Sequence, residues 1–268
     1  MTASQLDYFI SAPYAAVTGL IDQLGEAGMG VEFELNDPEW ILKVCELPAV
    51  SRLGRTLRQQ GIGRLVQGPF YDLAPGSLDP YIREHTQKLY IRTLDIAAAL
   101  EAEFVTFFTG YNTLLHARVL DQWFEVCRPL WRRVLDYAAR LDVRVLFANM
   151  FEDEPEIQLR LLDGLPPELC GVCLDVAGAY AFSKKKITSW VNLLGGRLEL
   201  VYLSDARVRD SERLPLGAGS FPLKDFYQAC MKKSLVPDIV FKMAPEQAFD
   251  SLQLVRKKGL GQYQIELL

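Results

Sequence analysis

Short apolar runs rich in β-branched and aromatic residues recur along the chain and alternate with longer segments whose apolar residues have helical spacing. Most of these runs are continuously apolar, which is typical of strands buried on both faces of a parallel sheet. The predicted strands cover residues 7–11, 29–35, 64–68, 104–109, 144–149, 171–175, 198–204 and 237–243. The predicted helices cover residues 14–27, 47–60, 79–102, 115–141, 154–164, 186–195, 222–233 and 246–258.

Eight strand–helix units joined by right-handed crossovers close most simply into a barrel. The chain has 268 residues, 50% of them hydrophobic, and (β/α)8 barrels run to about 250 residues as one domain. We therefore predict that residues 1–268 form a single (β/α)8 TIM barrel domain of the α/β class. A doubly wound open sheet is the rival fold, but it needs a glycine-rich first turn, and the first turn here reads SAPYAA.

Composition argues against two classes of partner. The formal net charge is -5 and the pI is about 5.3, whereas a protein that follows nucleic-acid phosphates has a basic balance or stripe. No apolar run approaches the roughly 18 residues of a membrane span, and the first residues, MTASQLDYFISAPY, do not resemble a signal peptide. The sequence thus predicts neither a nucleic-acid partner nor a membrane partner.

The five cysteines favour buried free thiols. Cys170 and Cys173 form a C-x-x-C, but no second pair exists, and Cys173 lies inside an apolar run. A metal or redox role for this pair is the alternative. Reduced thiols fit a cytoplasmic location, which is the predicted one.

In an α/β barrel the functional site lies where the strands end. The positions there are mostly polar, and the two histidines of the chain, His85 and His116, fall in or near helical segments instead. We see no metal cluster and no catalytic triad, so neither a metal nor another cofactor is expected. The predicted ligand-binding residues are Gln67, Asn149, Asp175, Tyr202, Asp205, Arg207, Arg213 and Lys242. Further strand-end candidates are Ser11, Glu32, Glu34 and Glu152, the last of which we interpret as charge support for a helix N-terminus.

Seven ordered segments resemble motifs of the xylose isomerase-like superfamily of TIM barrels, which contains sugar-phosphate isomerases and epimerases and the family 2 (endonuclease IV-type) AP endonucleases. The resemblance runs from about residue 5 to residue 258. The segments are GPFYDLAPGS, VTFFTGYN, LFANMFE, CGVCLDVAGAYAFS, LVYLSDAR, RLPLGAGSFPLKDF and VFKMAPEQAFDSLQLV.

The resemblance also implies eight metal-ligand or catalytic positions, of which only Asp175 has the expected residue. The other seven positions hold Gln67, Phe108, Ala148, Gly178, Tyr202, Arg213 and Lys242. One carboxylate with two cations close by does not compensate the desolvation of a divalent metal ion. We expect Lys242 to take over the electrostatic role of the metal and to pair with Asp175 across the barrel mouth.

Three functions remain open. The preferred one is a metal-free ligand-binding protein or pseudoenzyme on an isomerase/epimerase-like barrel. In it Arg207, Arg213 and Lys242 bind an anionic, hydroxylated small molecule, helped by backbone N–H groups of the loop LGAGS. A plainer alternative is that Lys242 and Asp175 are a structural pair that plugs a dead pocket.

The second function is a metal-independent isomerase, epimerase or lyase in which Lys242, Tyr202 or Asp175 is the catalytic group. The third is a metal-dependent isomerase or AP endonuclease, which requires Glu32, Glu34, Asp175 and Asp205 to converge. The resemblance further implies assembly through the barrel helices, so a homo-oligomer or a protein partner is also expected.

Overall fold

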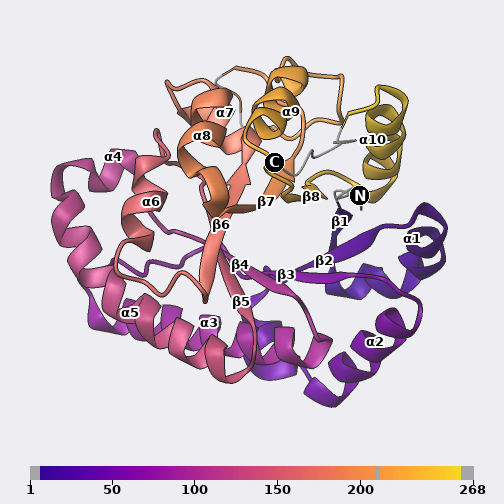
Figure 1. The fold of residues 1–268 in the computed structure, drawn as a ribbon. Coiled ribbons are helices and arrows are strands. Elements are labelled where there is room, and N and C mark those ends of the chain that lie inside the picture. The colour runs from indigo at the N-terminus through magenta and orange to yellow at the C-terminus, as the bar shows by residue number, and fades with distance from the viewer. Residues whose placement is uncertain (1–6, 209, 211, 261–268) are drawn as a thin grey trace.

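The computed structural model describes residues 7–208, 210 and 212–260, and in this part of the chain the eight strands form one closed barrel (Figure 1). Each neighbouring pair of strands is parallel, including the closing pair of β1 and β8. The strands are β1 (Tyr8–Pro13), β2 (Gly30–Glu34), β3 (Arg64–Gln67), β4 (Phe104–Phe108), β5 (Arg144–Ala148), β6 (Cys170–Asp175), β7 (Leu198–Leu203) and β8 (Asp238–Phe241). The predicted (β/α)8 barrel is confirmed.

Helices surround the barrel, with α3 and α5 on one side and α7, α8 and α9 on the other (Figure 1). The α-helices are α1 (Ile21–Ala27), α2 (Leu47–Gln59), α3 (Pro80–Leu100), α4 (Thr113–His116), α5 (Leu120–Arg140), α6 (Glu156–Leu162), α7 (Val176–Phe182), α8 (Ile187–Leu194), α9 (Leu223–Lys232) and α10 (Pro245–Lys257). Further helical segments, which are 3-10 helices except for the π-helix η2, are η1 (Tyr14–Leu20), η2 (Trp40–Val44), η3 (Ala117–Val119) and η4 (Gly195–Arg197).

Local sequence explains where α3 begins and ends. Asp79 is its N-cap and accepts a hydrogen bond from the Tyr81 N–H at 2.8 Å, while Pro80 occupies the first helical turn, where its missing N–H costs nothing. The helix ends at Glu101, which adopts the left-handed conformation with φ 56°. The helix predicted for residues 79–102 therefore starts where the sequence indicated.

Helix α7 was not predicted, and the reason lies in Asp175. This residue ends β6 and at once caps α7, because its side chain accepts a hydrogen bond from the Gly178 N–H at 3.1 Å. The turn from strand to helix thus contains no separate loop residues, and the segment VAGAYAF has no strong helical pattern of its own.

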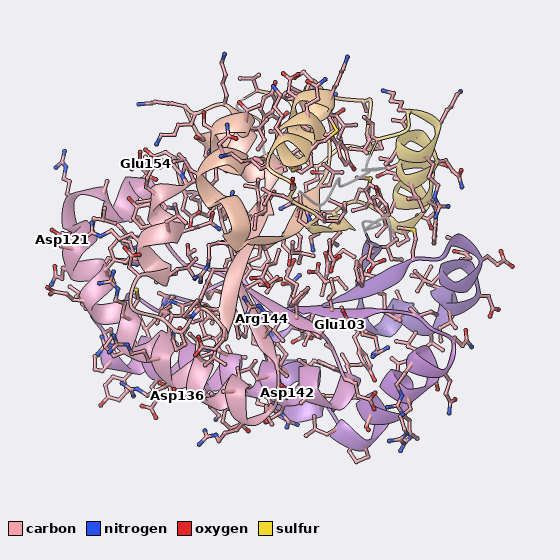
Figure 2. The ribbon with its side chains drawn as sticks, viewed as in Figure 1. Glu103, Asp121, Asp136, Asp142, Arg144 and Glu154 are labelled. Atoms are coloured by element: carbon pink, nitrogen blue, oxygen red, sulfur yellow. The ribbon has the colours of Figure 1, made fainter. Side chains whose placement is uncertain are left out.

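The strands separate two apolar layers because side chains of successive residues point to opposite faces. One layer fills the barrel interior and includes Phe9, Leu65, Leu146, Leu200 and Val240. The other lies between the strands and the helices and forms the larger core. On the outer surface, Asp121 and Asp136 of α5 are exposed to solvent (Figure 2).

The prediction of buried free thiols is confirmed, because all five cysteines are unbridged and buried. Cys170 belongs to the outer apolar layer and Cys173 to the barrel interior, so the C-x-x-C spacing places them on opposite faces of the sheet. No helix among residues 7–208, 210 and 212–260 is long and apolar enough to cross a membrane.

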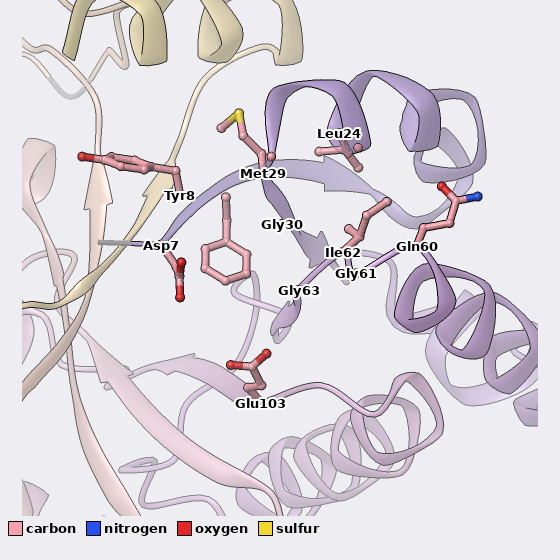
Figure 3. Close-up of a pocket in the computed structure, with 13 residues that line it drawn as sticks. Asp7, Tyr8, Leu24, Met29, Gly30, Gln60, Gly61, Ile62, Gly63 and Glu103 are labelled. Carbon is pink, nitrogen blue, oxygen red and sulfur yellow. The ribbon is translucent and has the colours of Figure 1, made fainter. Parts of the chain in front are cut away.

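A cavity of about 310 Å³ lies at the N-terminal end of the barrel, between the starts of β1, β2 and β3 (Figure 3). Asp7 and Glu103 line it, and Asp238 lies near both. Burial, and then the proximity of Asp7 and Glu103, raise the pKa of Asp238 to about 7. This end of a TIM barrel contributes to stability, whereas chemistry takes place at the opposite end.

Candidate functional site

The C-terminal half of the barrel interior is polar. Counting along each strand from the apolar interior residues, every second side chain also points inward. Phe9 is followed in this way by Ser11, Leu65 by Gln67, and Val240 by Lys242. The same alternation directs Glu32 and Glu34 of β2, Asp175 of β6 and Tyr202 of β7 toward the barrel axis.

Lys242 follows β8 and occupies the centre of this polar layer, where only 5% of the residue is exposed. Its Nζ lies 2.7 Å from Ser11 Oγ, 2.9 Å from Glu32 Oε2, 2.9 Å from Glu34 Oε1 and 2.6 Å from Gln67 Oε1, so three N–H groups are shared among four oxygens. These partners come from the three successive strands β1, β2 and β3. We call these five residues the lysine site.

Two further contacts complete the lysine site. Ser11 Oγ donates toward Glu34 Oε1 at 2.7 Å, and Tyr202 OH donates to Glu32 Oε1 at 2.6 Å. The ammonium also lies 4.7 Å from the centre of the Tyr202 ring, a distance suited to a cation–π contact. The single cation is therefore surrounded by two carboxylates and an aromatic face.

The charges in the lysine site stabilise one another. Burial opposes the charge on Lys242, but Glu32 and Glu34 outweigh it and raise the pKa of Lys242 above its ordinary value. Burial would raise the pKa of Glu34, but the Lys242 ammonium and the Ser11 hydroxyl hold it below its ordinary value. Lys242 therefore remains an ammonium at neutral pH.

Tyr202 also keeps its proton. Burial is the largest cause, and Glu32 adds to it, so the pKa of Tyr202 lies well above its ordinary value. A general base needs a pKa near the working pH. Neither Tyr202 nor Lys242 has one in this arrangement.

A second ion pair joins Arg213, in the loop between β7 and α9, to Asp175. The guanidinium donates to both carboxylate oxygens, with Nη1 lying 3.1 Å from Oδ1. Asn149 is fully buried and forms two hydrogen bonds to the Asp175 backbone. Its Oδ1 accepts from the Asp175 N–H at 2.8 Å, and its Nδ2 donates to the Asp175 carbonyl at 3.0 Å. Asp175 is itself fully buried, so Arg213 supplies its countercharge.

The predicted pair of Lys242 and Asp175 is wrong. Lys242 pairs with Glu32 and Glu34, and Asp175 pairs with Arg213. The reason is the order of the strands, since β8 lies beside β1 and close to β2, whereas Asp175 lies on β6 beside the loop that carries Arg213. Glu32 and Glu34 were considered only as lesser candidates, although two acids two residues apart in a buried strand must share one face.

Asp205 holds a loop together. Its Oδ1 accepts hydrogen bonds from the N–H groups of Ala206 and Phe221, both at 2.9 Å, and its Oδ2 accepts one from Gly217 at 2.8 Å. Gly219 packs so closely that a Cβ there would lie 2.4 Å from Asp205 Oδ1. The LGAGS loop, which we expected to offer N–H groups to a ligand, thus uses the Gly217 N–H internally.

Arg207 and Glu152 also differ from the sequence interpretation. Arg207 is exposed and pairs with Glu212 at 3.1 Å. Glu152 is fully buried and does not support a helix N-terminus. It accepts hydrogen bonds from the Thr109 hydroxyl and the Met150 N–H. Burial raises the pKa of Glu152 to about 7, with these hydrogen bonds opposing the change.

A pocket of about 160 Å³ opens above the lysine site, and we call it the mouth pocket. Of the predicted ligand-binding residues, Gln67, Arg213 and Lys242 line it directly, while Asp175 and Tyr202 lie beneath as their buried partners. Asn36 and Met150 line it too and were missed, since neither belongs to a strand. The complete lining is Glu34, Asn36, Gln67, Phe70, Tyr71, Phe108, Met150, Arg213 and Lys242.

The donor set at this point does not suit a divalent cation. Glu32 and Glu34 already share the Lys242 ammonium, and both oxygens of Asp175 are taken by Arg213. A metal ion here would have to displace one of these cations or lie beside it, which Coulomb repulsion opposes. Within the described ranges, no three His, Cys, Asp or Glu side chains are placed to hold a metal ion.

Comparison with known families identifies the family of this chain. The family model described as xylose isomerase-like TIM barrel matches residues 21–234. This protein belongs to the xylose isomerase-like TIM barrel family. No match is found among curated proteins.

Solved structures share the fold of this family member. A D-tagatose 3-epimerase-like protein superposes with a TM-score of 0.81 at 16% identity and covers 94% of this chain and 96% of its own. A Thermus thermophilus protein soaked with ZnCl2 gives 0.76 at 24% identity, covering 95% and 99%. The 3-keto-D-glucoside 4-epimerase from E. coli gives 0.71 at 13% identity, covering 94% and 100%.

Proposed function

We propose that this barrel is a metal-independent ligand-binding protein, a pseudoenzyme that retains an isomerase/epimerase-like scaffold. The observation that supports this proposal is the position of Lys242 Nζ, which lies within 2.9 Å of four side-chain oxygens on three neighbouring strands. An ammonium so placed supplies positive charge to the acids of the barrel mouth. A metal ion would otherwise perform that role.

The mouth pocket fits a small, hydroxylated ligand. Asn36, Gln67 and Arg213 line it with polar side chains, and Phe70 and Phe108 line it with aromatic rings, a combination typical of small-molecule sites. Structural neighbours include a D-tagatose 3-epimerase-like protein and a 3-keto-D-glucoside 4-epimerase. We therefore propose a sugar or a sugar-like polyol.

Charge pairing favours a neutral ligand over an anionic one. Lys242 is shared by two carboxylates and Arg213 is held by Asp175 in a two-pronged contact, so neither cation faces the pocket without a partner. A carboxylate or phosphate would compete with these internal partners. An anionic ligand stays a prediction, so neutral and anionic compounds should both be tested for binding.

The second candidate is a metal-independent proton-transfer enzyme, and the epimerase neighbours are its support. The raised pKa values of Lys242 and Tyr202 disfavour both as bases. Exchange of a ketose C–H proton in D2O, measured by NMR with a chelator present, tests this candidate. If the protein catalyses this exchange and the Tyr202→Phe variant does not, the protein is an enzyme, and the proposal of a binding protein is wrong.

Thermal unfolding against a panel of neutral ketoses, aldoses and polyols tests the proposed function, beside phosphosugars and dicarboxylates. At a ligand concentration about a hundredfold above Kd, the expected stabilisation is about 2.7 kcal/mol. For a domain of this size the Tm should then rise by roughly 5–10 °C. The rise should be unchanged by EDTA, and elemental analysis should find no stoichiometric Mn, Mg or Zn.

Asn36→Ala provides the site variant, because Asn36 is exposed at the pocket and its replacement should leave the fold intact. Asn192→Ala, at an exposed position of α8, is the matched control. The ligand-induced rise should shrink in Asn36→Ala and persist in Asn192→Ala. A stoichiometric metal whose removal abolishes binding would overturn the proposal and restore the metal-dependent isomerase or AP endonuclease.

We also propose a cytoplasmic location, which five reduced and buried thiols would suit. Assembly with a second copy or with another protein stays a prediction. Size-exclusion chromatography with light scattering would measure it directly.

A further inference from the structure

A second, more apolar pocket of about 270 Å³ adjoins the mouth pocket, and we call it the aromatic groove. It lies between the loops that follow β3 and β4. Phe70, Tyr71, Phe108 and Met150 line both spaces, so the two share a wall. A ligand seated at the lysine site therefore has this groove as its immediate neighbour.

Flat rings form the shared wall. The Phe70 ring lies 4.8 Å from the Phe108 ring at an interplanar angle of 65°, and 5.2 Å from the Tyr71 ring at 68°. Aromatic rings favour such edge-to-face contacts, and the Phe70 ring also lies 6.2 Å from the ring of Phe151, another lining residue. Tyr71 is 67% exposed and Leu115, which also lines the groove, is 71% exposed, so apolar surface in the groove remains uncovered.

Three polar residues of the groove, Thr109, Asn112 and His116, form hydrogen bonds within the surrounding loops. Asn112 Oδ1 accepts the Leu114 N–H at 2.9 Å, and the Asn112 N–H donates to His116 Nδ1 at 2.9 Å. Burial lowers the pKa of His116, which keeps the imidazole neutral at pH 7. The Thr109 hydroxyl is engaged by Glu152 and by the Tyr111 N–H. These groups are poorly placed to bind another sugar ring.

We propose that the ligand of the mouth pocket carries a flat apolar substituent, most simply an aryl group, and that the aromatic groove holds it. This inference rests on the proposed function and specifies its ligand as an amphipathic molecule, a hydroxylated head joined to an aromatic group as in an aryl glycoside. An apolar cavity of about 150 Å³ accommodates benzene in another protein, so the groove has room for such a group.

Paired glycosides provide the test. The methyl and 4-nitrophenyl glycosides of common aldohexoses and pentoses, with free 4-nitrophenol, are titrated by calorimetry. For at least one sugar, the 4-nitrophenyl glycoside should bind tenfold or more tightly than its methyl partner. Free 4-nitrophenol should bind more weakly than that glycoside, because it lacks the contacts in the mouth pocket.

Neighbouring leucines of α4 give a matched pair of variants. Leu115 lines the groove, whereas Leu114 does not and is 94% exposed. Leu115→Lys should reduce the preference for the aryl glycoside at least fivefold and leave the Kd of the methyl glycoside unchanged. Leu114→Lys introduces the same charge one residue away and should change neither value.

The outcomes separate the two proposals. Equal affinities for aryl and methyl glycosides would overturn the role of the groove and leave the hydroxylated-ligand function standing. Binding of neither glycosides nor free sugars would overturn both. If a co-purifying protein were lost from Leu115→Lys and retained by Leu114→Lys, the groove would be a protein-docking surface, and the aryl assignment would be wrong.

Discussion

Lys242 determines whether the two acids of β2 can be tolerated inside the barrel. Glu32 is fully buried, and an isolated buried carboxylate is strongly unfavourable unless it is paired and hydrogen-bonded. Tyr202 and Lys242 provide those partners. The stability of the lysine site thus depends on one ammonium that arrives from a strand remote in sequence.

Replacing Lys242 by methionine should therefore destabilise the protein. The change leaves Glu32 and Glu34 without their countercharge, and breaking a buried pair in this way costs about 3–5 kcal/mol. Urea unfolding at pH 7 measures the loss. The double variant Lys242→Met with Glu32→Gln should recover part of it, because one unpaired charge is removed. A loss under about 1 kcal/mol would mean that water penetrates and solvates the site.

Among the connecting elements, the loop between β7 and α9 matters most for the site because it carries Arg213. Asp205 joins the two ends of this loop by accepting three backbone N–H groups. Arg213 follows within the same loop and pairs with Asp175. The positioning of Arg213 is therefore coupled to a carboxylate that does not itself line the mouth pocket.

Asp205→Ala should loosen this loop. Hydrogen bonds to a charged group each contribute about 1.5–3 kcal/mol, so the expected destabilisation is about 2 kcal/mol or more. Hydrogen exchange of the Gly217 and Phe221 amides should become faster. Glu212→Ala, an exposed change in the same loop, is the control and should cost no more than about 0.5 kcal/mol. Unchanged exchange in Asp205→Ala would mean that other contacts hold the loop.

The positions of the strands were the part of the fold that local sequence determined best. Each predicted strand overlaps an observed one, because continuous apolar runs between helical segments have few other interpretations. The partners inside the barrel could not be derived in the same way. Which acid pairs with Lys242 depends on the order of the strands and on which side chains point into the closed barrel. No local sequence pattern indicates that Glu34, and not Asp175, lies within hydrogen-bond distance of Lys242.

At the scale of the whole molecule, the two ends of the barrel differ in how their acidic side chains are paired. The mouth contains acids paired with Lys242 and Arg213, whereas at the N-terminal end Asp238 lies near Asp7 and Glu103. Burial, and then the nearby like charges, make the native state hold a proton on Asp238 that the unfolded chain releases.

A pH-dependent stability follows. Because the pKa of Asp238 rises from 3.8 to about 7 on folding, the native state binds more protons than the unfolded state between these values. The free energy of unfolding should thus fall as pH rises toward 7, and then level off. Asp238→Asn should gain Tm relative to the unmodified protein on moving from pH 5 to pH 8. Asp136→Asn, exposed on α5, is the control and should show no such change.

The placement of all five thiols inside the packed layers has a practical consequence. An alkylating reagent can reach them only when the barrel opens, since the thiols stay shielded from bulk reagent in the closed molecule. Brief labelling followed by mass spectrometry would therefore measure the rate at which each region opens. Cys173 reports on the barrel interior, and Cys230 reports on α9. If Cys230 reacts before Cys173, the helical shell loosens while the inner sheet is still intact.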